Sequence, residues 1–431
     1  MTRAMRRPIA AAIGALAVAA TTAACGGGSG DDASEGDGTL NVWIMQGTNP
    51  DADDFFDEVS TAFEEETGAT LDVEFVEWAD AHDRFVTSIA GGTTPDVAET
   101  GTTWTPEFAD AGALAPLDEQ VEGAGVTDDL VEGLVEAGTY DGQLYGMPWY
   151  AGVRSLVYNT EMFEQAGVEP PTTWAELEDA AAALKEEFPD KIAVAVPGDA
   201  EFTVYPWVWG AGGEVATLEG DTWTSQLDSP ESQEGIEFWT GLATEGGYSS
   251  AGATTWRETD VLDSFAAGDV GMAVMGSWTP GAIVDANPDM DGKFAAVPIP
   301  GKDGGMSPSV LGGSHLSMFE TAEDKDLAFA FIEMMTTGEF AQKWGEQSGY
   351  FPGQVSLLDE TLESTDPLVA PFAEQFVDGG ASVPAAPTYG AVQAKATTST
   401  MMQSILAGDA DVATASAAAA EEMTTILNGS E

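Results

Sequence analysis

Hydrophobic positions near the start of the folded part alternate between the spacing of strands and that of helices. Leu71, Val73 and Phe75 recur at every second position, as in a strand, whereas Phe85 and Ile89 lie one helical turn apart. An apolar run at 40–45 precedes them and predicts a first strand, and Phe55, Phe56, Val59 and Phe63 have the spacing of a first helix. The run 97–98 follows them and begins a third strand, so the predicted order is strand, helix, strand, helix, strand. This alternation predicts an α/β fold with a mostly parallel sheet and helices on both faces.

The rest of the chain keeps this mixture. Asp141-Gly142 predicts a hairpin turn, and residues 153–158 and 270–275 read as buried strands. Helices are predicted to start after Thr173 and Ser229, since Glu176 stands at capping-box spacing from Thr173 and Pro230 directly follows Ser229. Further helices are predicted over 260–267 and 412–427, and the chain shows no internal repeat.

The first residues predict export. Residues 1–24 have a basic start and an apolar run, 8–20, that is too short to span a bilayer, so they are predicted to be a signal peptide. The residues around Cys25, TAACG, resemble the lipobox at which a bacterial lipoprotein is cut and lipidated. Cys25 is the only cysteine, so we expect it to be lipidated, with 25–38 forming the lipidated residue and a flexible tether. Secretion without a lipid is the alternative.

Charge narrows the choice of ligand. The chain has 74 acidic and 13 basic residues and a formal net charge of -61. Such a surface repels phosphate backbones, so nucleic-acid binding is excluded, and an anionic ligand would need a dedicated cationic pocket. A neutral or cationic solute fits better, although the acid excess is also explained by solubility in high salt.

Seven short motifs, in order and at family spacing, resemble those of the family 1 extracellular solute-binding proteins. They are VWIM (42–45), TPDV (94–97), FADAGAL (108–114), LYGMPWY (144–150), PTTW (171–174), FAAGDVGM (265–272) and LGGS (311–314). Within this family the chain is most similar to proteins that bind amino-sugar disaccharides such as diacetylchitobiose, because 108–114, Arg154 and 276–278 recur together there.

The resemblance implies a two-lobed, type II periplasmic-binding-protein-like fold with the ligand cleft between the lobes. It places three chain crossings, which act as a hinge, near Pro148, Leu311 and Pro352. The implied lobes are 39–148 plus 312–352, and 149–311 plus 353–428. It also implies a monomeric lipoprotein at the extracellular face of the cell membrane, which captures an oligosaccharide for the permease subunits of an ABC importer and has no cofactor and no enzymatic activity.

Candidate binding residues follow from the chemistry of sugars. A sugar presents flat C–H faces for aromatic stacking and a rim of hydroxyls for polar groups, and ligands of open parallel sheets meet the loops after the strands. From the residues we expect Gln46, Trp78, Thr103, Trp149, Tyr150, Ser277, Trp278 and Gly313 in the cleft. The resemblance adds Tyr205 and Tyr389 as stacking residues. Arg154 is predicted either to bind a sugar hydroxyl or to pair with an acid.

Other residues have simpler interpretations. Trp43 and Trp174 are predicted to pack in the core, and Glu77 and Glu99 are interpreted as solvated acids. His82 and His315 have no cysteine partners, and the stretch 285–292 lacks the closing Glu of a calcium loop, so no metal site is predicted.

Three alternative functions remain open. The sugar could be of the maltose or cellobiose type, or a monosaccharide. A secreted glycoside hydrolase would also combine aromatics with paired acids, and 74 acids supply many pairs. A purely structural surface lipoprotein is the third alternative.

Overall fold

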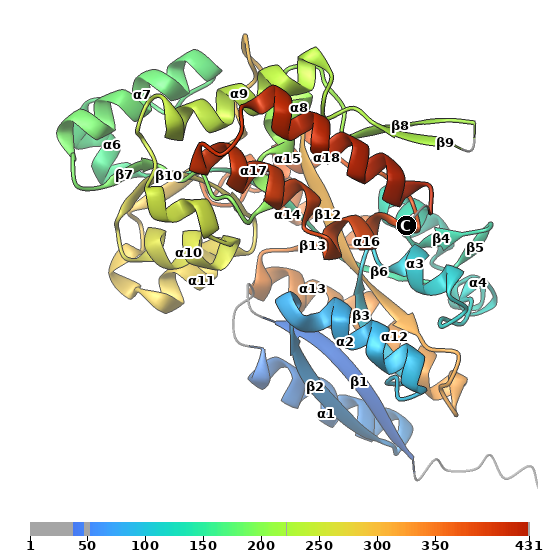
Figure 1. Ribbon diagram of the computed structural model, residues 1–431. Coiled ribbons are helices and arrows are strands. Elements are labelled where there is room, and N and C mark those ends of the chain that lie inside the picture. Colours follow the sequence, from blue (N-terminus) through green and yellow to red (C-terminus); the bar gives the residue numbers. More distant parts are fainter. Residues whose placement is uncertain (1–37, 47–51, 221, 430–431) are drawn as a thin grey trace, which may run out of the picture. The chain divides into compact units, whose positions relative to one another are not determined.

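The computed structural model describes residues 38–46, 52–220 and 222–429 (Figure 1). The predicted signal peptide and Cys25 lie outside the described residues. No helix in the described ranges is long and apolar enough to cross a membrane.

The first part of the fold is the predicted strand-helix repeat. It comprises β1 (Thr39–Gln46), α1 (Asp53–Thr67), β2 (Thr70–Glu77), α2 (Trp78–Gly91) and β3 (Val97–Gly101). β1 pairs in parallel with both β2 and β3. The apolar face of α1 is buried against this sheet, and the helix ends at Gly68 in the left-handed conformation (φ 75°) that glycine adopts without a steric penalty. The order predicted from the sequence is therefore confirmed.

The expectation of a mostly parallel sheet is wrong. The main sheet has the strand order β2-β1-β3-β12-β6-β10-β7, in which β6 (Met147–Asn159) and β12 (Ser309–Met318) occupy the centre. β12 pairs antiparallel with β3 and with β6, and β6 pairs antiparallel with β10 (Val270–Gly276). Hydrophobic periodicity indicates a strand but not its direction, because side chains alternate in the same way in both orientations.

The remaining strands are β4 (Thr139–Tyr140), β5 (Gln143–Leu144), β7 (Ile192–Val194), β8 (Ala216–Glu219), β9 (Thr222–Ser225), β11 (Phe294–Val297), β13 (Phe351–Pro352) and β14 (Gly380–Ala381). The remaining α-helices are α3 (Thr105–Asp110), α4 (Asp118–Ala124), α5 (Glu132–Gly138), α6 (Thr160–Ala166), α7 (Trp174–Glu187), α8 (Tyr205–Gly210), α9 (Pro230–Thr244), α10 (Glu258–Ala266), α11 (Thr279–Ala286), α12 (Lys325–Thr336), α13 (Gly338–Ser348), α14 (Asp359–Leu362), α15 (Ala370–Gly379), α16 (Tyr389–Ala394), α17 (Thr397–Ala407) and α18 (Val412–Leu427).

Local sequence signals fix several of these elements. Asp141 and Gly142 both have positive φ (48° and 79°) between β4 and β5, as a tight hairpin requires. Thr173 and Ser229 cap α7 and α9, because their side-chain oxygens accept the amides of Glu176 and Ser232. The predicted hairpin and helix starts are confirmed.

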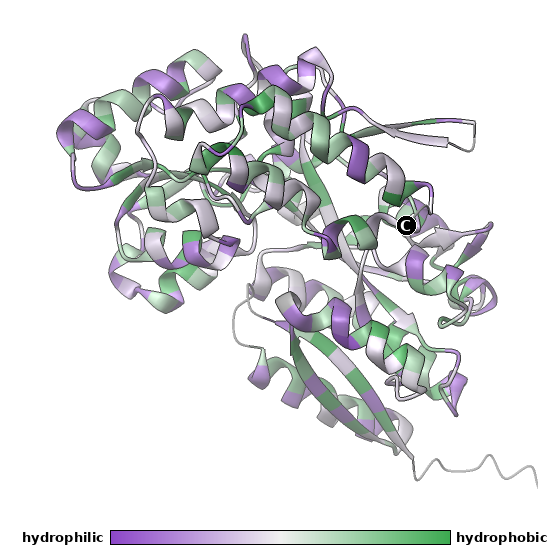
Figure 2. Ribbon diagram, viewed as in Figure 1, coloured by the Kyte–Doolittle hydropathy of each residue, from purple (hydrophilic) through white to green (hydrophobic). Residues whose placement is uncertain are grey.

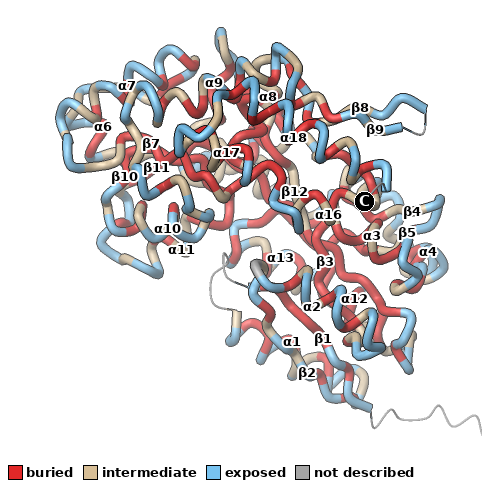
Figure 3. Tube along the Cα trace, viewed as in Figure 1, coloured by how far each residue is buried: buried red, intermediate tan, exposed pale blue. Residues whose placement is uncertain are grey.

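Apolar residues run along the central strands (Figure 2), and the same strands are buried while the hairpin of β8 and β9 is mostly exposed (Figure 3). Although the described residues belong to one compact unit, the core falls into separate clusters. One cluster contains Phe63 and the other buried residues of α1, whereas another contains Trp207 and Trp239. Trp43 and Trp174 are buried, as predicted.

Two of these clusters draw on residues 40–150 and 316–350 together with Trp278, and the other two draw on residues 153–310 and 351–427. Apart from Trp278, the described chain therefore changes from one pair of clusters to the other at three places. These changes fall between Tyr150 and Val153 on β6, between Val310 and Leu316 on β12, and between Tyr350 and Phe351 at β13. β6 pairs with both other segments, so all three changes lie side by side in the sheet.

Candidate functional site

A cavity of about 270 Å³ lies where the three central segments meet. Its lining comes from the end of β3, from β6 and β12, and from residues far away in the chain. The residues are Trp78, Gly101, Thr102, Thr103, Trp104, Tyr150, Gly152, Arg154, Phe202, Glu258, Trp278, Val310, Leu311, Gly312, Gly313, Ser314, Tyr350, Val383 and Gln393. The described residues of both main cores thus contribute to one concave surface.

Aromatic rings form two parts of this lining. Tyr350 stacks on Tyr150 with ring centroids 4.1 Å apart, and on its other side it stacks on Trp278 at 5.1 Å. Trp78 and Trp104 form a second, tilted pair at 5.3 Å. Extended apolar faces of this kind are suited to the C–H face of a sugar ring.

Glycine makes room for the first group of rings. A Cβ atom on Gly152 would lie 2.5 Å from the Trp278 ring, closer than side-chain contacts allow. Gly313 on β12, which pairs with Ala151, likewise has no space for a side chain because the carbonyl oxygen of Tyr150 faces it. The absence of side chains at these two positions therefore lets the Trp278 ring and the Tyr150 carbonyl pack directly against the backbone.

Arg154 lines the cavity and is also paired with an acid. Its Nε and Nη2 donate hydrogen bonds to the carboxylate of Glu258 at 2.7 to 3.1 Å. The guanidinium group lies 4.8 Å from the centre of the Phe202 ring and 5.0 Å from that of Trp278. The cation is therefore held in place by an ion pair and two rings, which fixes its position at the cavity wall.

Glu99 is completely buried behind the cavity, so its interpretation as a solvated acid is wrong. Its carboxylate accepts hydrogen bonds from the Met45 amide (2.8 Å), from the Ser314 hydroxyl (2.5 Å) and from the Tyr150 hydroxyl. Burial raises the pKa of Glu99 to about 7, and these three donors offset only part of that effect. Glu99 thereby links β1, β3, β6 and β12 beneath two residues of the lining.

A second, partly buried acid holds the amide of Gln393. Gln393 Nε2 donates to Glu201 at 2.6 Å, and its Oε1 accepts the hydroxyl of Thr103 at 2.8 Å. Burial raises the pKa of Glu201 to about 6. The hydrogen bonds fix the orientation of the amide, and they connect α16 with the loop that follows β3.

Six of the residues predicted from the sequence line this cavity: Trp78, Thr103, Tyr150, Arg154, Trp278 and Gly313. The structure places the other five elsewhere. Trp149 is buried and stacks on Trp344, because successive side chains of β6 point to opposite faces. Tyr205 and Tyr389 are fully buried and their hydroxyls are hydrogen-bonded to each other at 3.0 Å.

Gln46 and Ser277 are the other two. The side chain of Gln46 donates to Glu77 at 2.9 Å at the exposed end of β1. Ser277 lines a separate cavity of about 330 Å³ on the far side of Tyr350, between α13 and α15.

The lining residues that were not predicted include Phe202, Glu258, Tyr350 and Gln393. Tyr350 lies two residues before Pro352, where a crossing was expected, so its position was a usable signal. The other three carry no local signal, because they reach the cavity only through the packing of helices distant in sequence.

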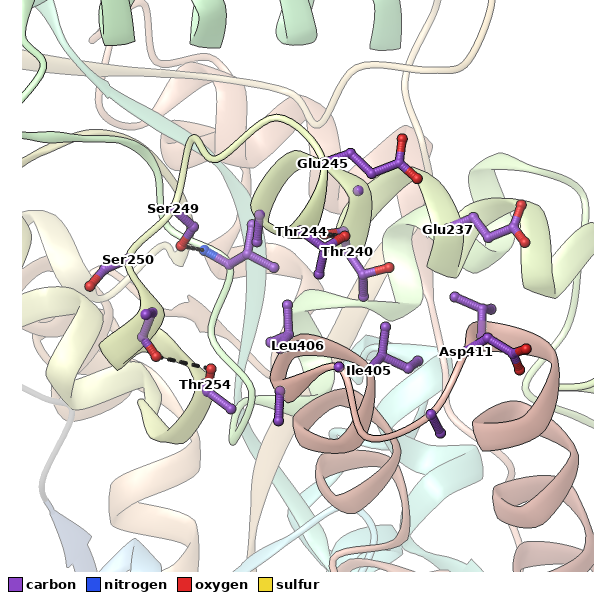
Figure 4. Close-up of a pocket in the computed structure, with 18 residues that line it drawn as sticks. Glu237, Thr240, Thr244, Glu245, Ser249, Ser250, Thr254, Ile405, Leu406 and Asp411 are labelled. Carbon is purple, nitrogen blue, oxygen red and sulfur yellow. Dashed lines mark hydrogen bonds between the residues drawn. The ribbon is translucent and has the colours of Figure 1, made fainter.

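A larger pocket of about 780 Å³ lies at the surface between α9, α17 and the loop before α18 (Figure 4). Its described lining is made of hydroxyl, acidic and aliphatic residues, with Glu237, Glu245 and Asp411 at its edge, and none of them is aromatic. It lacks stacking surfaces, so the aromatic cavity is the better sugar site. No group of three or more metal-binding side chains occurs among the residues that the structure describes.

Known proteins are similar to this chain in sequence and in fold. The sequence profile of the bacterial extracellular solute-binding protein family matches residues 47–341. The diacetylchitobiose binding protein DasA of Streptomyces coelicolor is 28% identical over 398 residues, which cover 90% of this chain and 91% of that protein. The maltotriose-binding protein of Pyrococcus abyssi is 28% identical over 336 residues, or 75% of this chain and 68% of that protein.

Solved structures of solute-binding proteins have the same fold as this chain. The structure of an ABC transporter solute-binding protein from Thermotoga lettingae, bound with alpha-D-tagatose, has a TM-score of 0.82 at 28% identity and covers 90% of this chain and 99% of that one. The GacH receptor of Streptomyces glaucescens, at 23% identity and a TM-score of 0.78, covers 92% and 100% and shares the fold. The two-lobed α/β fold is therefore established, and the chain belongs to the family of bacterial extracellular solute-binding proteins.

Proposed function

We propose that this protein captures a sugar or short oligosaccharide outside the cytoplasm and delivers it to an ABC importer. The observation that carries the proposal is the aromatic cavity at the junction of the two cores, with polar groups at its edge. The relatives named above are described as binding diacetylchitobiose, maltotriose and tagatose, all of which are sugars.

Ligand contact is proposed for the residues that line the cavity. Trp278, Trp78 and Trp104 would stack on the sugar, whereas Tyr350, whose two faces are covered by Tyr150 and Trp278, would contact the sugar by its edge. The polar edge would bind the hydroxyls, through the backbone of Gly313 and through four side chains: Thr103, Arg154, Glu258 and Gln393.

The charges of the cavity favour a neutral ligand. Arg154 is the only cation among the lining residues, and Glu258 already neutralises it. An anionic sugar would find no unpaired positive side chain among these described residues, whereas a hydroxyl can donate to Glu258 or accept from Arg154. The uronic-acid type of sugar is thus disfavoured.

Binding without cleavage is the function that this geometry supports. Hydrolysis of a glycosidic bond ordinarily uses two carboxyl groups on either side of the bond. Glu258 is the only carboxylate in the described lining, and it is held by Arg154. Glu99 is buried, and Glu201 is partly buried and accepts a hydrogen bond from Gln393. Incubation with a bound oligosaccharide should therefore yield no cleavage products.

The arrangement of the two lobes completes the proposal. We assign 39–148 plus 312–352 to one lobe and 149–311 plus 353–428 to the other, and closure of the lobes would enclose the ligand. Lipidation of Cys25 would hold a monomer at the extracellular face of the membrane, near its permease partners.

The proposal is tested by a thermal-shift screen against mono- and oligosaccharides. A ligand that binds only the folded state raises the melting temperature by mass action. We expect a rise with at least one neutral sugar and none with the matching uronic acid. If no sugar shifts the transition, while a peptide or an amino acid does, the assignment to sugars is wrong.

A further inference from the structure

Helix α16 is anchored in one lobe and contacts the other. Tyr389, its first residue, is fully buried in the cluster that contains Trp207 and Trp239, and the helix packs against α17 and α18. Its last turn carries Gln393, which hydrogen-bonds to Thr103 in the loop after β3. In Figure 1 this short helix lies between α18 and the end of β3.

A second contact joins the same helix to the opposite lobe. A side chain at Gly390 would overlap the carboxylate of Glu107 on α3 and come within 3.3 Å of His82 on α2. That carboxylate cannot move freely, because both of its oxygens lie 3.0 to 3.1 Å from His82 Nε2. The absence of a side chain at position 390 therefore lets α16 lie directly against α2 and α3.

The hydrogen bond between Thr103 and Gln393 forms part of the cavity wall, since both residues line it. Gln393 is not free to swing aside, because its Nε2 donates to the partly buried Glu201 and this hydrogen bond would be lost. The enclosed volume of about 270 Å³ equals about nine water molecules at ~30 Å³ each. This leaves room for roughly one or two sugar rings.

We propose that α16, through the hydrogen bond from Thr103 to Gln393 and the contact of Gly390 with Glu107, closes one side of the cavity and limits the ligand to a mono- or disaccharide. This inference rests on the proposed sugar-binding function. Longer oligosaccharides would have to break the bridge and separate α16 from α3, so their affinity would fall with each added unit.

Calorimetric titration of two series tests the length limit. The ligands are β-1,4-linked N-acetylglucosamine oligomers and α-1,4-linked glucose oligomers, each of one to four units. For the unaltered protein we expect the affinity to fall at least tenfold from two units to four. Gln393→Ala removes the wall and the bridge, and this fall should then shrink to less than threefold. Thr103→Ala breaks the same bridge from the other lobe and should act in the same direction.

Gln342→Ala is the matched control, because Gln342 is exposed on α13 and lies outside the cavity. It should leave the dependence on length unchanged. The length limit is refuted, while sugar binding stands, if the unaltered protein binds oligomers of four units as tightly as those of two. It is also refuted if both bridge variants lower the affinity for oligomers of every length by the same factor. If neither series binds and no other sugar does, the proposed function fails, and the length limit fails with it.

Discussion

His315 lies fully buried between two hydrogen-bond partners. Its Nε2 donates to the carbonyl oxygen of Leu134 at 2.9 Å, so its Nδ1 is the acceptor for the hydroxyl of Thr105, also at 2.9 Å. Burial lowers the pKa of His315 to about 4, which keeps the ring neutral near pH 7. Glu99 shows the opposite case, since burial raises the pKa of a carboxyl group. The same environment thus disfavours the charged form of both residues.

The raised pKa of Glu99 makes stability depend on pH. Between its usual value of 4.5 and about 7, the folded state binds more protons at this site than the unfolded state, so stability decreases as the pH rises through this window. Comparison with Glu99→Gln isolates the effect, because contributions from Glu201 and His315 cancel in the difference. We expect the difference in unfolding free energy to change by about 3 kcal/mol between about pH 4.5 and about pH 7.5.

Urea denaturation at several pH values measures this difference. A difference that does not vary with pH would show that Glu99 titrates normally in the folded protein.

Trp278 is the residue whose loss should be most visible in binding. It stacks on Tyr350 and also lies beside Arg154. Trp278→Ala should weaken binding of the best ligand from the screen at least tenfold, or about 1.4 kcal/mol, as measured by calorimetry. Trp223→Ala serves as a control, because Trp223 lies on the β9 hairpin away from the cavity. Equal affinities for the two variants would place the binding site elsewhere.

At the level of elements, β6 and β12 determine the shape of the site. Gly152 on β6 pairs directly with Gly312 on β12, yet the two glycines have different surroundings. A Cβ atom on Gly152 would meet the Trp278 ring, whereas a Cβ atom on Gly312 would have no atom within 4 Å. The pair therefore provides an internally matched test of how tightly the rings pack on the sheet.

Gly152→Ala should destabilise the protein by about 1–3 kcal/mol, because the added methyl group displaces the ring of Trp278. Gly312→Ala should change stability by less than about 0.5 kcal/mol. Urea denaturation with tryptophan fluorescence measures both, and the displaced ring should also alter the native emission of the first variant. Similar stabilities of the two variants would mean that the Trp278 ring can be displaced from Tyr350 at little cost in free energy.

For the whole molecule, the separation of the cores is compatible with the proposed closure of two lobes without unfolding. Apart from Trp278, the described chain passes between the two pairs of clusters at three places, all adjacent to one another through β6. We expect rotation about these segments to leave the two pairs of clusters intact, so its cost should be small compared with that of opening either of them.

We expect the radius of gyration to decrease when a sugar from the screen is added, as measured by small-angle X-ray scattering. Ligand contacts from both lobes favour the closed form over any open one. Trp278→Ala at the same sugar concentration is the control and should show a smaller decrease. An unchanged radius, at a sugar concentration that saturates the protein by calorimetry, would contradict closure.

Several features of this protein could be read from the sequence because they depend on neighbours along the chain. The strand-helix order, the hairpin at Asp141 and Gly142 and the caps at Thr173 and Ser229 are set by residues within a few positions of one another. Short motifs in a fixed order also indicated the family. Of the site residues predicted from strand ends or crossings, Trp78, Tyr150 and Trp278 line the cavity, whereas Gln46, Trp149 and Ser277 do not.

Only the tertiary structure decided the rest. The antiparallel directions of β6 and β12, the burial of Glu99, the removal of Tyr205 and Tyr389 into the core, and the arrival of Glu258 and Gln393 at the cavity all depend on contacts between residues tens to hundreds of positions apart. Hydrophobic periodicity specifies which face of an element is buried but not what lies opposite it. The sequence by itself therefore determined the elements and the family, whereas packing determined which polar and aromatic side chains share the cavity.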